Sequence, residues 1–245
     1  MQKIPFFDYS AVYKRYEVEF DRIFKDVCSR GAFILQKDLE EFEKNLSVFL
    51  GADHVYGVAD GTNAMVLGLK ACKIGEGDEV IIASHTYIAT AAAVRLVGAE
   101  PIFADIGDDF MFCPESAEKL ITGKTKALMP TQLNGRCCNM KQIGDLANQY
   151  GLMVFEDSAQ GLGAKFQGKN AGTFGKFGTL SFYPAKLLGC FGDGGAIMTN
   201  DKSVSDHIAL LRDHGRDNDG RVVDWGTNSR LDNLQAAFLD FRLKN

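Results

Sequence analysis

Residues 181–195 read S-F-Y-P-A-K-L-L-G-C-F-G-D-G-G, a short β-type run followed by one lysine and a glycine-rich turn. The apolar neighbours of Lys186 are Phe182, Tyr183, Leu187, Leu188 and Phe191. We expect them to cover much of its stem and to lower its pKa, because burial disfavours the charged ammonium. A lysine with a lowered pKa is a nucleophile toward carbonyls. The alternative is a lysine whose stem lies on apolar surface while its ammonium reaches water.

Short apolar runs alternate with helical patterns upstream of this stretch. The strand-like runs are residues 55–59, 80–83, 101–104, 127–130 and 153–155, and helical patterns begin near Thr62, Tyr87, Glu115 and Met140. This alternation predicts βαβ units. Because the runs are almost wholly apolar, we expect strands that helices cover on both faces. The sequence therefore predicts an α/β fold with a mostly parallel central sheet flanked by helices.

Helical patterns also occupy both ends of the chain. Apolar residues at helical spacing around Phe20 and Phe42 predict two amphipathic helices, separated by a turn at Gly31, within an N-terminal helical segment of residues 1–50. A last helical pattern begins at Asn228 and reaches Asn245 without a terminating glycine or proline. We expect this helix to lead toward a further C-terminal domain that the sequence does not contain.

Composition excludes several classes of function. The 245 residues are 46% hydrophobic and 24% charged, which is typical of a soluble globular protein. A net charge of -5, without a cluster of Lys and Arg, argues against nucleic acid as a partner. Neither a signal peptide nor a membrane-spanning run is present, and the six cysteines form no C-x-x-C pair. We expect a cytoplasmic protein with reduced thiols, no membrane contact and, since the four histidines are scattered, no metal site.

Polar residues follow several predicted strands at their carboxyl ends, where parallel sheets bind ligands. Gly61-Thr62-Asn63 follows the first strand and opens a helix, so its free amides and hydroxyl suit a phosphate, although Thr62 is also an ordinary helix N-cap. Asp157 follows a buried strand. It either caps a turn or pairs with the ring nitrogen of a pyridine cofactor. Gln160 is then within reach of a ring oxygen, and Tyr87 offers a flat face to the ring or simply belongs to the core.

Four motifs in this order and spacing resemble one protein family. They are G-T-N at 61–63, T-Y-I-A-T at 86–90, F-E-D-S-A-Q at 155–160, and S-F-Y-P-A-K at 181–186 with G-D-G-G at 192–195. The sequence resembles the pyridoxal-phosphate-dependent sugar aminotransferases of the DegT/DnrJ/EryC1/StrS family along its whole length. The resemblance implies an aspartate-aminotransferase-like (fold type I) large domain over residues 1–245, with the C-terminal small domain absent, and pyridoxal 5'-phosphate as cofactor.

The resemblance also implies roles for individual residues. Lys186 falls on the lysine that bonds to the cofactor aldehyde and then moves the proton between the substrate Cα and the cofactor C4′. Asp157 falls on the partner of the pyridine nitrogen, Gln160 on the residue at the phenolic oxygen, and Tyr87 on the aromatic residue that stacks over the ring. The alternative in which the Lys186 ammonium simply reaches water, without a role in binding, is therefore disfavoured.

Further matching positions concern the cofactor phosphate and the subunit arrangement. Gly61, Thr62 and Ser181 match the phosphate site. Asn228, in G-T-N-S-R, matches the asparagine that reaches the phosphate of the neighbouring subunit's cofactor. The resemblance thus implies a homodimer with shared active sites.

The implied reaction moves an amino group from an amino acid, most often glutamate, to a keto group of a nucleotide-linked sugar, as in polysaccharide biosynthesis. Gln36 and T-Q-L-N-G at 131–135 depart from the family pattern at positions that we associate with substrate preference, and Lys186 disfavours the related dehydratases, which have histidine there. Two alternatives remain. One is a catalytically incomplete chain that binds the cofactor, or pairs with a partner, without turnover. The other is a cysteine desulfurase, which the tight placement of Cys190 beside Lys186 disfavours.

Overall fold

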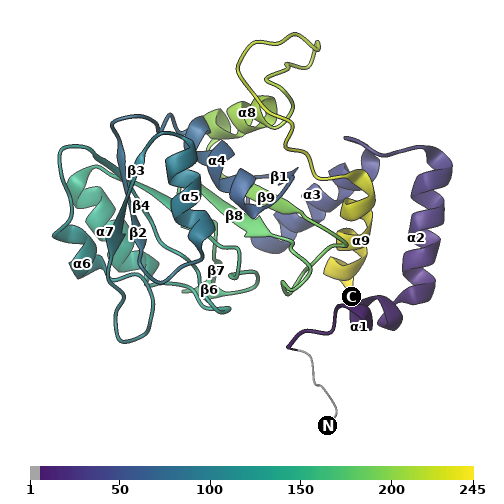
Figure 1. The fold of residues 1–245 in the computed structure, drawn as a ribbon, viewed down its shortest axis with the longest axis horizontal. Helices are drawn as coiled ribbons and strands as arrows, with labels where there is room; N and C mark the ends of the chain where they lie inside the picture. The colour runs from purple at the N-terminus through teal and green to yellow at the C-terminus, as the bar shows by residue number, and fades with distance from the viewer. Residues whose placement is uncertain (1–5) are drawn as a thin grey trace.

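A seven-stranded sheet forms the centre of the molecule in the computed structural model, which describes residues 6–245 (Figure 1). The strands are β1 (His54–Val58), β2 (Glu79–Ala83), β3 (Glu100–Ala104), β4 (Thr125–Met129), β5 (Met153–Asp157), β8 (Phe177–Ser181) and β9 (Gly195–Thr199). Their order is β1-β9-β8-β5-β4-β2-β3. β9 pairs antiparallel with both of its neighbours, and every other pairing in this sheet is parallel. The predicted α/β fold with a mostly parallel sheet is confirmed.

Helices cover both faces of the sheet and explain its apolar strands. On one face α4 (Gly61–Ala71), α5 (Ile88–Leu96) and α8 (Lys202–Leu211) share a core with Ile82, Met129 and Ile197. On the other face α6 (Pro114–Glu118) and α7 (Met140–Tyr150) cover Ile81 and Leu128. There α3 (Lys37–Leu50) and α9 (Asn233–Lys244) cover the β1-β9-β8 end. Successive strand residues therefore enter opposite cores, which is why the runs do not alternate with polar residues.

The predicted helices and strands agree with the structure within a few residues, apart from the start of the last helix and four omissions, of which the first is α1 (Tyr9–Arg15). β9 was not predicted, because its glycine-rich start resembles a turn, and α8 was not predicted either. A small hairpin of β6 (Lys165–Phe166) and β7 (Lys169–Asn170) was also missed. β6 and β7 have only two residues each, and β9 owes its extended form to the two strands beside it.

The N-terminal segment contains α1 (Tyr9–Arg15) and α2 (Glu17–Arg30) before α3. The predicted pair of amphipathic helices corresponds to α2 and α3, and Gly31 between them has φ 61°, a left-handed conformation that suits glycine. α2 packs on α9 through Phe20, Ile23 and Phe238. Residues 1–5 of the predicted 1–50 segment lie outside the described residues.

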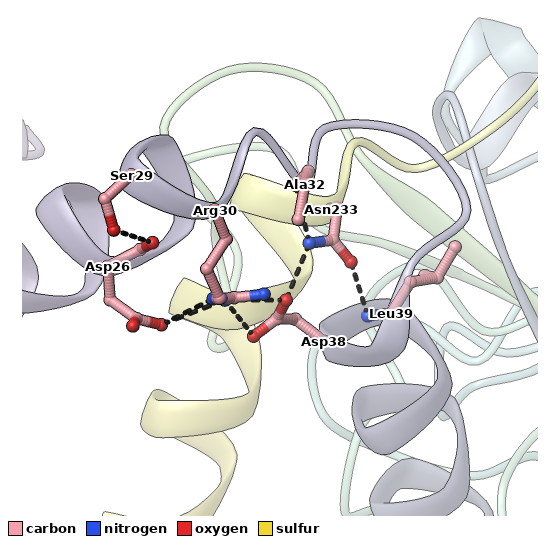
Figure 2. A network of polar contacts seen from close by, with 7 residues as sticks. All are labelled: Asp26, Ser29, Arg30, Ala32, Asp38, Leu39 and Asn233. Carbon is pink, nitrogen blue, oxygen red and sulfur yellow. Dashed lines mark hydrogen bonds and ion pairs between the residues drawn. The ribbon is translucent and has the colours of Figure 1, made fainter.

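A polar network fixes the start of α9 against the N-terminal helices (Figure 2). The buried Asn233 side chain donates to Ala32 O at 2.8 Å and to Asp38 Oδ2 at 2.7 Å, and it accepts from Leu39 N at 2.9 Å. Arg30 donates to the Asp38 carboxylate at 3.0 Å. The first residue of α9 is thus bonded to the α2–α3 connection and to the first turn of α3.

The last helix begins at Asn233 and not at Asn228, so that prediction was wrong. Residues 227–229 bond instead to the end of α8: Thr227 N donates to Leu211 O at 2.8 Å and Ser229 N donates to Arg212 O at 2.9 Å. These contacts hold the backbone extended before α9 can start. The connection between α8 and α9 projects from the body of the molecule (Figure 1).

Candidate active site

A cavity of about 1040 Å³ opens at the carboxyl ends of the parallel strands. The predicted site residues that line it are Gly61, Thr62, Tyr87, Asp157, Gln160, Ser181 and Lys186. They come from the β1–α4 turn, the start of α5, the end of β5 and the segment after β8. The parallel topology therefore gathers side chains that are more than a hundred positions apart in the sequence. Asn228 is exposed and is not among the residues that line this cavity.

One end of the cavity is suited to an anion. Asp60 caps α4 by accepting from Asn63 N at 2.8 Å, while the amides of Gly61 and Thr62 have no acceptor in the described part of the chain. The Ser181 hydroxyl accepts from Tyr183 N at 3.3 Å, so its own proton remains available to donate. Free amides at the N-terminus of an eleven-residue helix, together with hydroxyl donors, are groups that suit a phosphate.

Gly195 permits the close packing behind this anion site. It starts β9 and pairs with both Val58 and Ser181. A Cβ atom at this position would lie 2.4 Å from Asp60 C and 2.7 Å from Gly61 N. Since these are backbone atoms, they cannot move aside without displacing the amides that face the cavity.

Asp157 is the last residue of β5 and is only 3% exposed. Its carboxylate accepts from Thr90 Oγ1 at 2.6 Å and from Ala159 N at 3.1 Å. Burial raises the pKa of Asp157, and its hydrogen bonds and the charge of Lys186 oppose that change. No ion pair joins Asp157 to a cation in the described residues. The carboxylate therefore lacks a direct cationic partner at the cavity wall.

Lys186 is half-buried in the turn after β8, where its backbone amide donates to Tyr183 O at 2.8 Å. Burial lowers the pKa of Lys186, as expected from the sequence, and the charge of Asp157 acts in the opposite direction. The apolar surroundings are less complete than predicted: Phe182 and Leu188 are buried, whereas Leu187 is 78% exposed. Lys186 lines the cavity and is accessible from it.

Gln160 and Tyr87 complete the wall. Gln160 Oε1 accepts from Asn134 N at 3.0 Å, and its amide nitrogen has no acceptor among the described residues, so it can donate to a ligand. Tyr87 precedes α5 and is 72% exposed, which excludes the core role that the sequence left open. Tyr87 lines the cavity, and an exposed aromatic ring at such a wall is suited to stack on a ligand ring.

The family model for DegT/DnrJ/EryC1/StrS aminotransferases matches residues 15–245. This chain belongs to that family. It is 40% identical over 242 residues to the dTDP-3-amino-3,4,6-trideoxy-alpha-D-glucose transaminase of Streptomyces venezuelae, an alignment that covers 98% of this chain and 64% of the relative. The chain therefore spans less than two thirds of the length of that curated relative.

Solved structures of family members have the same fold. The structure of S. venezuelae DesV in complex with a ketimine intermediate matches with a TM-score of 0.96 and 40% identity, over 100% of this chain and 66% of that one. NtdA from Bacillus subtilis with bound cofactor PMP matches with a TM-score of 0.92 and 36% identity, over 100% of this chain and 56% of that one. The fold is that of the fold type I aminotransferases, as predicted, and the family depends on pyridoxal phosphate.

The cavity of this family member fits pyridoxal phosphate on its own geometry. The unbonded amides of Gly61 and Thr62 suit the phosphate, and the Lys186 amine suits the aldehyde. The buried Asp157 carboxylate, which has no cation paired with it in residues 6–245, suits a protonated ring nitrogen. Each functional group of the cofactor thus has a complementary group on the wall.

Several buried polar residues of the site were not identified from the sequence. Thr90 and Thr131 are buried, and Thr90 bonds directly to Asp157. Glu156, which the sequence grouped with Asp157, is buried away from the cavity lining and accepts from Gly172 N at 2.7 Å and Gly175 N at 3.0 Å. Glu156 therefore holds a neighbouring loop. The spacing of Thr86 and Thr90, four residues apart at a helix start, was the only local signal for these contacts.

Cys190 does not have the properties of a reactive thiol. Burial raises its pKa to about 12, and its Sγ donates to Phe182 O at 3.2 Å. Within residues 6–245, no group of three or more His, Cys, Asp or Glu side chains is arranged to hold a metal ion. None of the helices in that range is both long and apolar enough to cross a membrane.

Proposed function

We propose that this chain transfers an amino group from an amino acid, with glutamate as the preferred donor, to a keto group of a nucleotide-linked sugar, using pyridoxal phosphate. The observation that supports this most directly is the meeting of Lys186, Asp157 and the free N-terminus of α4 in one cavity of about 1040 Å³. The 40% identical relative is named as a transaminase of a dTDP-linked amino sugar, which supports this class of acceptor.

In this proposal each residue has a defined task. When bound, the cofactor supplies an electron sink for the amino-acid carbon that loses its proton. Lys186 Nζ accepts that proton and returns it, and the lowered pKa of Lys186 increases the neutral fraction of the amine at neutral pH. Asp157 holds a proton on the ring nitrogen, and Gly61, Thr62 and Ser181 bind the phosphate. Gln160 donates to the ring oxygen, and Tyr87 covers the ring and excludes water from it.

Cofactor binding is tested by adding pyridoxal phosphate and recording the absorption spectrum. The wild-type protein is expected to develop a near-visible band that borohydride fixes, because a lysine–cofactor bond is reducible. Lys186→Ala should lack the band. Lys176→Ala is the matched control, since Lys176 pairs with Asp201 at 2.9 Å and lies outside the cavity lining. A band of equal strength in Lys186→Ala would contradict the assignment of the lysine.

Amino transfer is tested separately from binding. Glutamate added to the loaded protein should convert the near-visible band to the shorter-wavelength absorption of the pyridoxamine form and release 2-oxoglutarate in equal amount. A nucleotide-linked keto sugar should then restore the first band. A band that persists unchanged with glutamate and with other amino-acid donors would contradict transfer and favour a chain that binds the cofactor without turnover.

We also propose that two copies of this chain share their active sites in a homodimer, in which Asn228 of each copy reaches the cofactor phosphate of the other. Support comes from the position of Asn228, which is exposed on the projecting α8–α9 connection and does not line the cavity of its own chain. The location that we propose is the cytoplasm, which the six free thiols favour.

A further inference from the structure

A chain of three threonine hydroxyls leads to the Asp157 carboxylate. Thr90 Oγ1 donates to Asp157 Oδ2 at 2.6 Å, Thr86 Oγ1 lies 2.7 Å from Thr90 Oγ1, and Thr131 Oγ1 lies 2.8 Å from Thr86 Oγ1. Thr90 lies in the first turn of α5 and Thr86 lies just before that helix, whereas Thr131 follows β4. The chain therefore joins three separate elements around one carboxylate.

The direction of these hydrogen bonds follows from the number of protons available. A threonine hydroxyl has one proton to donate, and an ionised carboxylate can only accept. Since Thr90 gives its proton to Asp157, it must accept from Thr86. Thr86 must then accept from Thr131 for the same reason. All three hydroxyl dipoles point toward Asp157 when the carboxylate is charged, and hydrogen bonds in such a series polarise one another.

Few other groups act on the Asp157 carboxylate. The Ala159 amide donates to its other oxygen at 3.1 Å, and Lys186 is the charged side chain that acts on it across the cavity. The neighbouring Glu156 carboxylate accepts from the Gln132 side chain and from the backbone amides of residues 172, 174 and 175. The donor to Oδ2 is therefore Thr90, which is fully buried and out of reach of replacement by bulk water.

We propose that Thr90 is a positioning residue that keeps Asp157 ionised and oriented, with Thr86 and Thr131 polarising its hydroxyl, so that Asp157 holds the proton on the cofactor ring nitrogen. This inference rests on the proposed function for its link to the cofactor. The part that concerns Thr90 and Asp157 can be measured in the apoprotein. A hydrogen bond to a charged acceptor is strong, so its loss is expected to raise the Asp157 pKa by about one to two units.

The first experiment measures the Asp157 carboxyl pKa in the apoprotein by ¹³C NMR, with Asp157→Asn to assign the signal. Thr90→Val keeps the shape of the side chain and removes the donor, so the Asp157 pKa should rise by about one unit or more. Thr90→Ser restores a hydroxyl and should return the pKa toward the wild-type value. Thr86→Val should give a smaller rise, because Thr86 acts through Thr90.

A matched control separates this effect from a general loss of packing. Thr173 is also buried and donates its hydroxyl to a backbone carbonyl, Asn170 O, at 2.7 Å, but it does not line the cavity. Thr173→Val should lower stability without moving the Asp157 pKa. If Thr90→Val does not fold, the Asp157 pKa of Thr86→Val is compared with that of the wild type, and this comparison tests the proposal. An Asp157 pKa that is the same in wild type and in the folded threonine variants overturns the proposal.

The second experiment tests the link to the cofactor through the pH midpoint of the near-visible band in the loaded protein. A ring nitrogen that holds its proton less firmly leaves the lysine-linked nitrogen more basic, so the midpoint should rise in Thr90→Val and return in Thr90→Ser. If Thr90→Val raises the Asp157 pKa in the apoprotein but leaves the midpoint of the band unchanged, the proposed link between Thr90 and the cofactor ring nitrogen is overturned. If no variant or wild-type protein binds the cofactor, the proposed function fails, and the apoprotein titration still decides the role of Thr90.

Discussion

The environment of the cavity wall shifts the pKa values of Lys186 and Asp157 in opposite directions. Burial lowers the pKa of the lysine and raises the pKa of the aspartate, so each group is driven toward its neutral form. Their mutual attraction opposes this in both cases. A bound anion near Lys186 and a ring cation near Asp157 would offset the cost of burying each charged group. The apoprotein therefore retains an electrostatic cost that a zwitterionic ligand removes.

Because burial disfavours the charged form of Lys186, we expect a pH-dependent difference in stability between the wild-type apoprotein and a variant that lacks this lysine. Lys186→Met removes a group whose folded-state pKa lies below its unfolded-state value near 10.4. The variant should be the more stable below the folded-state pKa, and its advantage should vanish as pH rises through the unfolded-state value. Because half of the lysine is in contact with water, we expect less than about 1 kcal/mol.

Thermal unfolding at a series of pH values measures this difference. For a chain of this size, 1 kcal/mol corresponds to about 2–4 °C in Tm. Lys176→Met is the control, because the pKa of Lys176 is raised by Asp201 and its removal should lower stability at neutral pH. A variant advantage that grows with pH would contradict the expected sign.

Among the secondary-structure elements, the buried parallel strands could be predicted from the sequence. The antiparallel strand β9, which depends on tertiary contacts, could not. Residues 80–83 and 127–130 form continuous apolar runs because both faces of the sheet are covered. β9 begins in a glycine pair that predicts a turn, and only its neighbours β1 and β8 impose a strand. The sequence pointed to Asp157 and Lys186 as candidates, to which the family resemblance then gave roles, but it did not predict the partner of Asp157, since Thr90 is 67 positions away.

Gly195 offers a test of the packing behind the anion site. Gly195→Ala would place a Cβ atom against the Asp60–Gly61 backbone, so we expect a loss of about 1–3 kcal/mol in the free energy of unfolding. Displacement of the amides should also weaken cofactor binding by about tenfold.

The neighbouring glycine is the control for that variant. A Cβ at position 194 would meet the side chains of Cys190 and Leu231 at 3.0 Å, and these can adjust. Gly194→Ala should therefore have a smaller effect on binding. Denaturant unfolding and a spectroscopic cofactor titration measure both quantities, and equal binding losses in the two variants would argue against a backbone clash as the cause.

Asn233 tests the attachment of α9. Asn233→Ala removes the donor to Ala32 O and the acceptor for Leu39 N inside a buried region, so we expect a loss of about 1–3 kcal/mol. Asn45 also joins α3 to α9, through one partly buried bond of 2.6 Å to Asp240. Asn45→Ala should cost less, about 1 kcal/mol or under. Chemical denaturation compares the two, and a greater loss in Asn45→Ala would contradict the importance assigned to Asn233.

In the whole molecule, the projecting α8–α9 connection carries three exposed apolar side chains among its many charged ones. Trp225 is 91% exposed, and Val222 and Val223 are exposed near it. His207 on α8 bonds to Asp224 at 2.6 Å, and the Asp213–Asn228 bridge closes the base of the loop. A loop that is held in place at two points and that presents an indole to solvent has the features of an interface element. This supports the proposed homodimer.

Mixed dimers test whether active sites are shared. Lys186→Ala should lack the near-visible band, and Asn228→Ala should bind the cofactor weakly. When the two are mixed and allowed to exchange subunits, one site in each hybrid regains both residues, so the tight-binding band should recover to about a quarter of the wild-type value. Trp225→Ser should shift sedimentation toward the monomer and prevent the recovery. No recovery between two variants that form hybrids would contradict sharing.

The position of the antiparallel strand β9, between the edge strand β1 and the rest of the sheet, has a consequence for the order in which the chain folds. β1 pairs only with β9 in the sheet, although about 140 positions separate them in the sequence. During synthesis β1 therefore cannot pair in the sheet until residues 195–199 have left the ribosome. The anion site, although its glycine and threonine are translated early, is therefore completed only when Gly195 is available to pack behind Asp60 and Gly61.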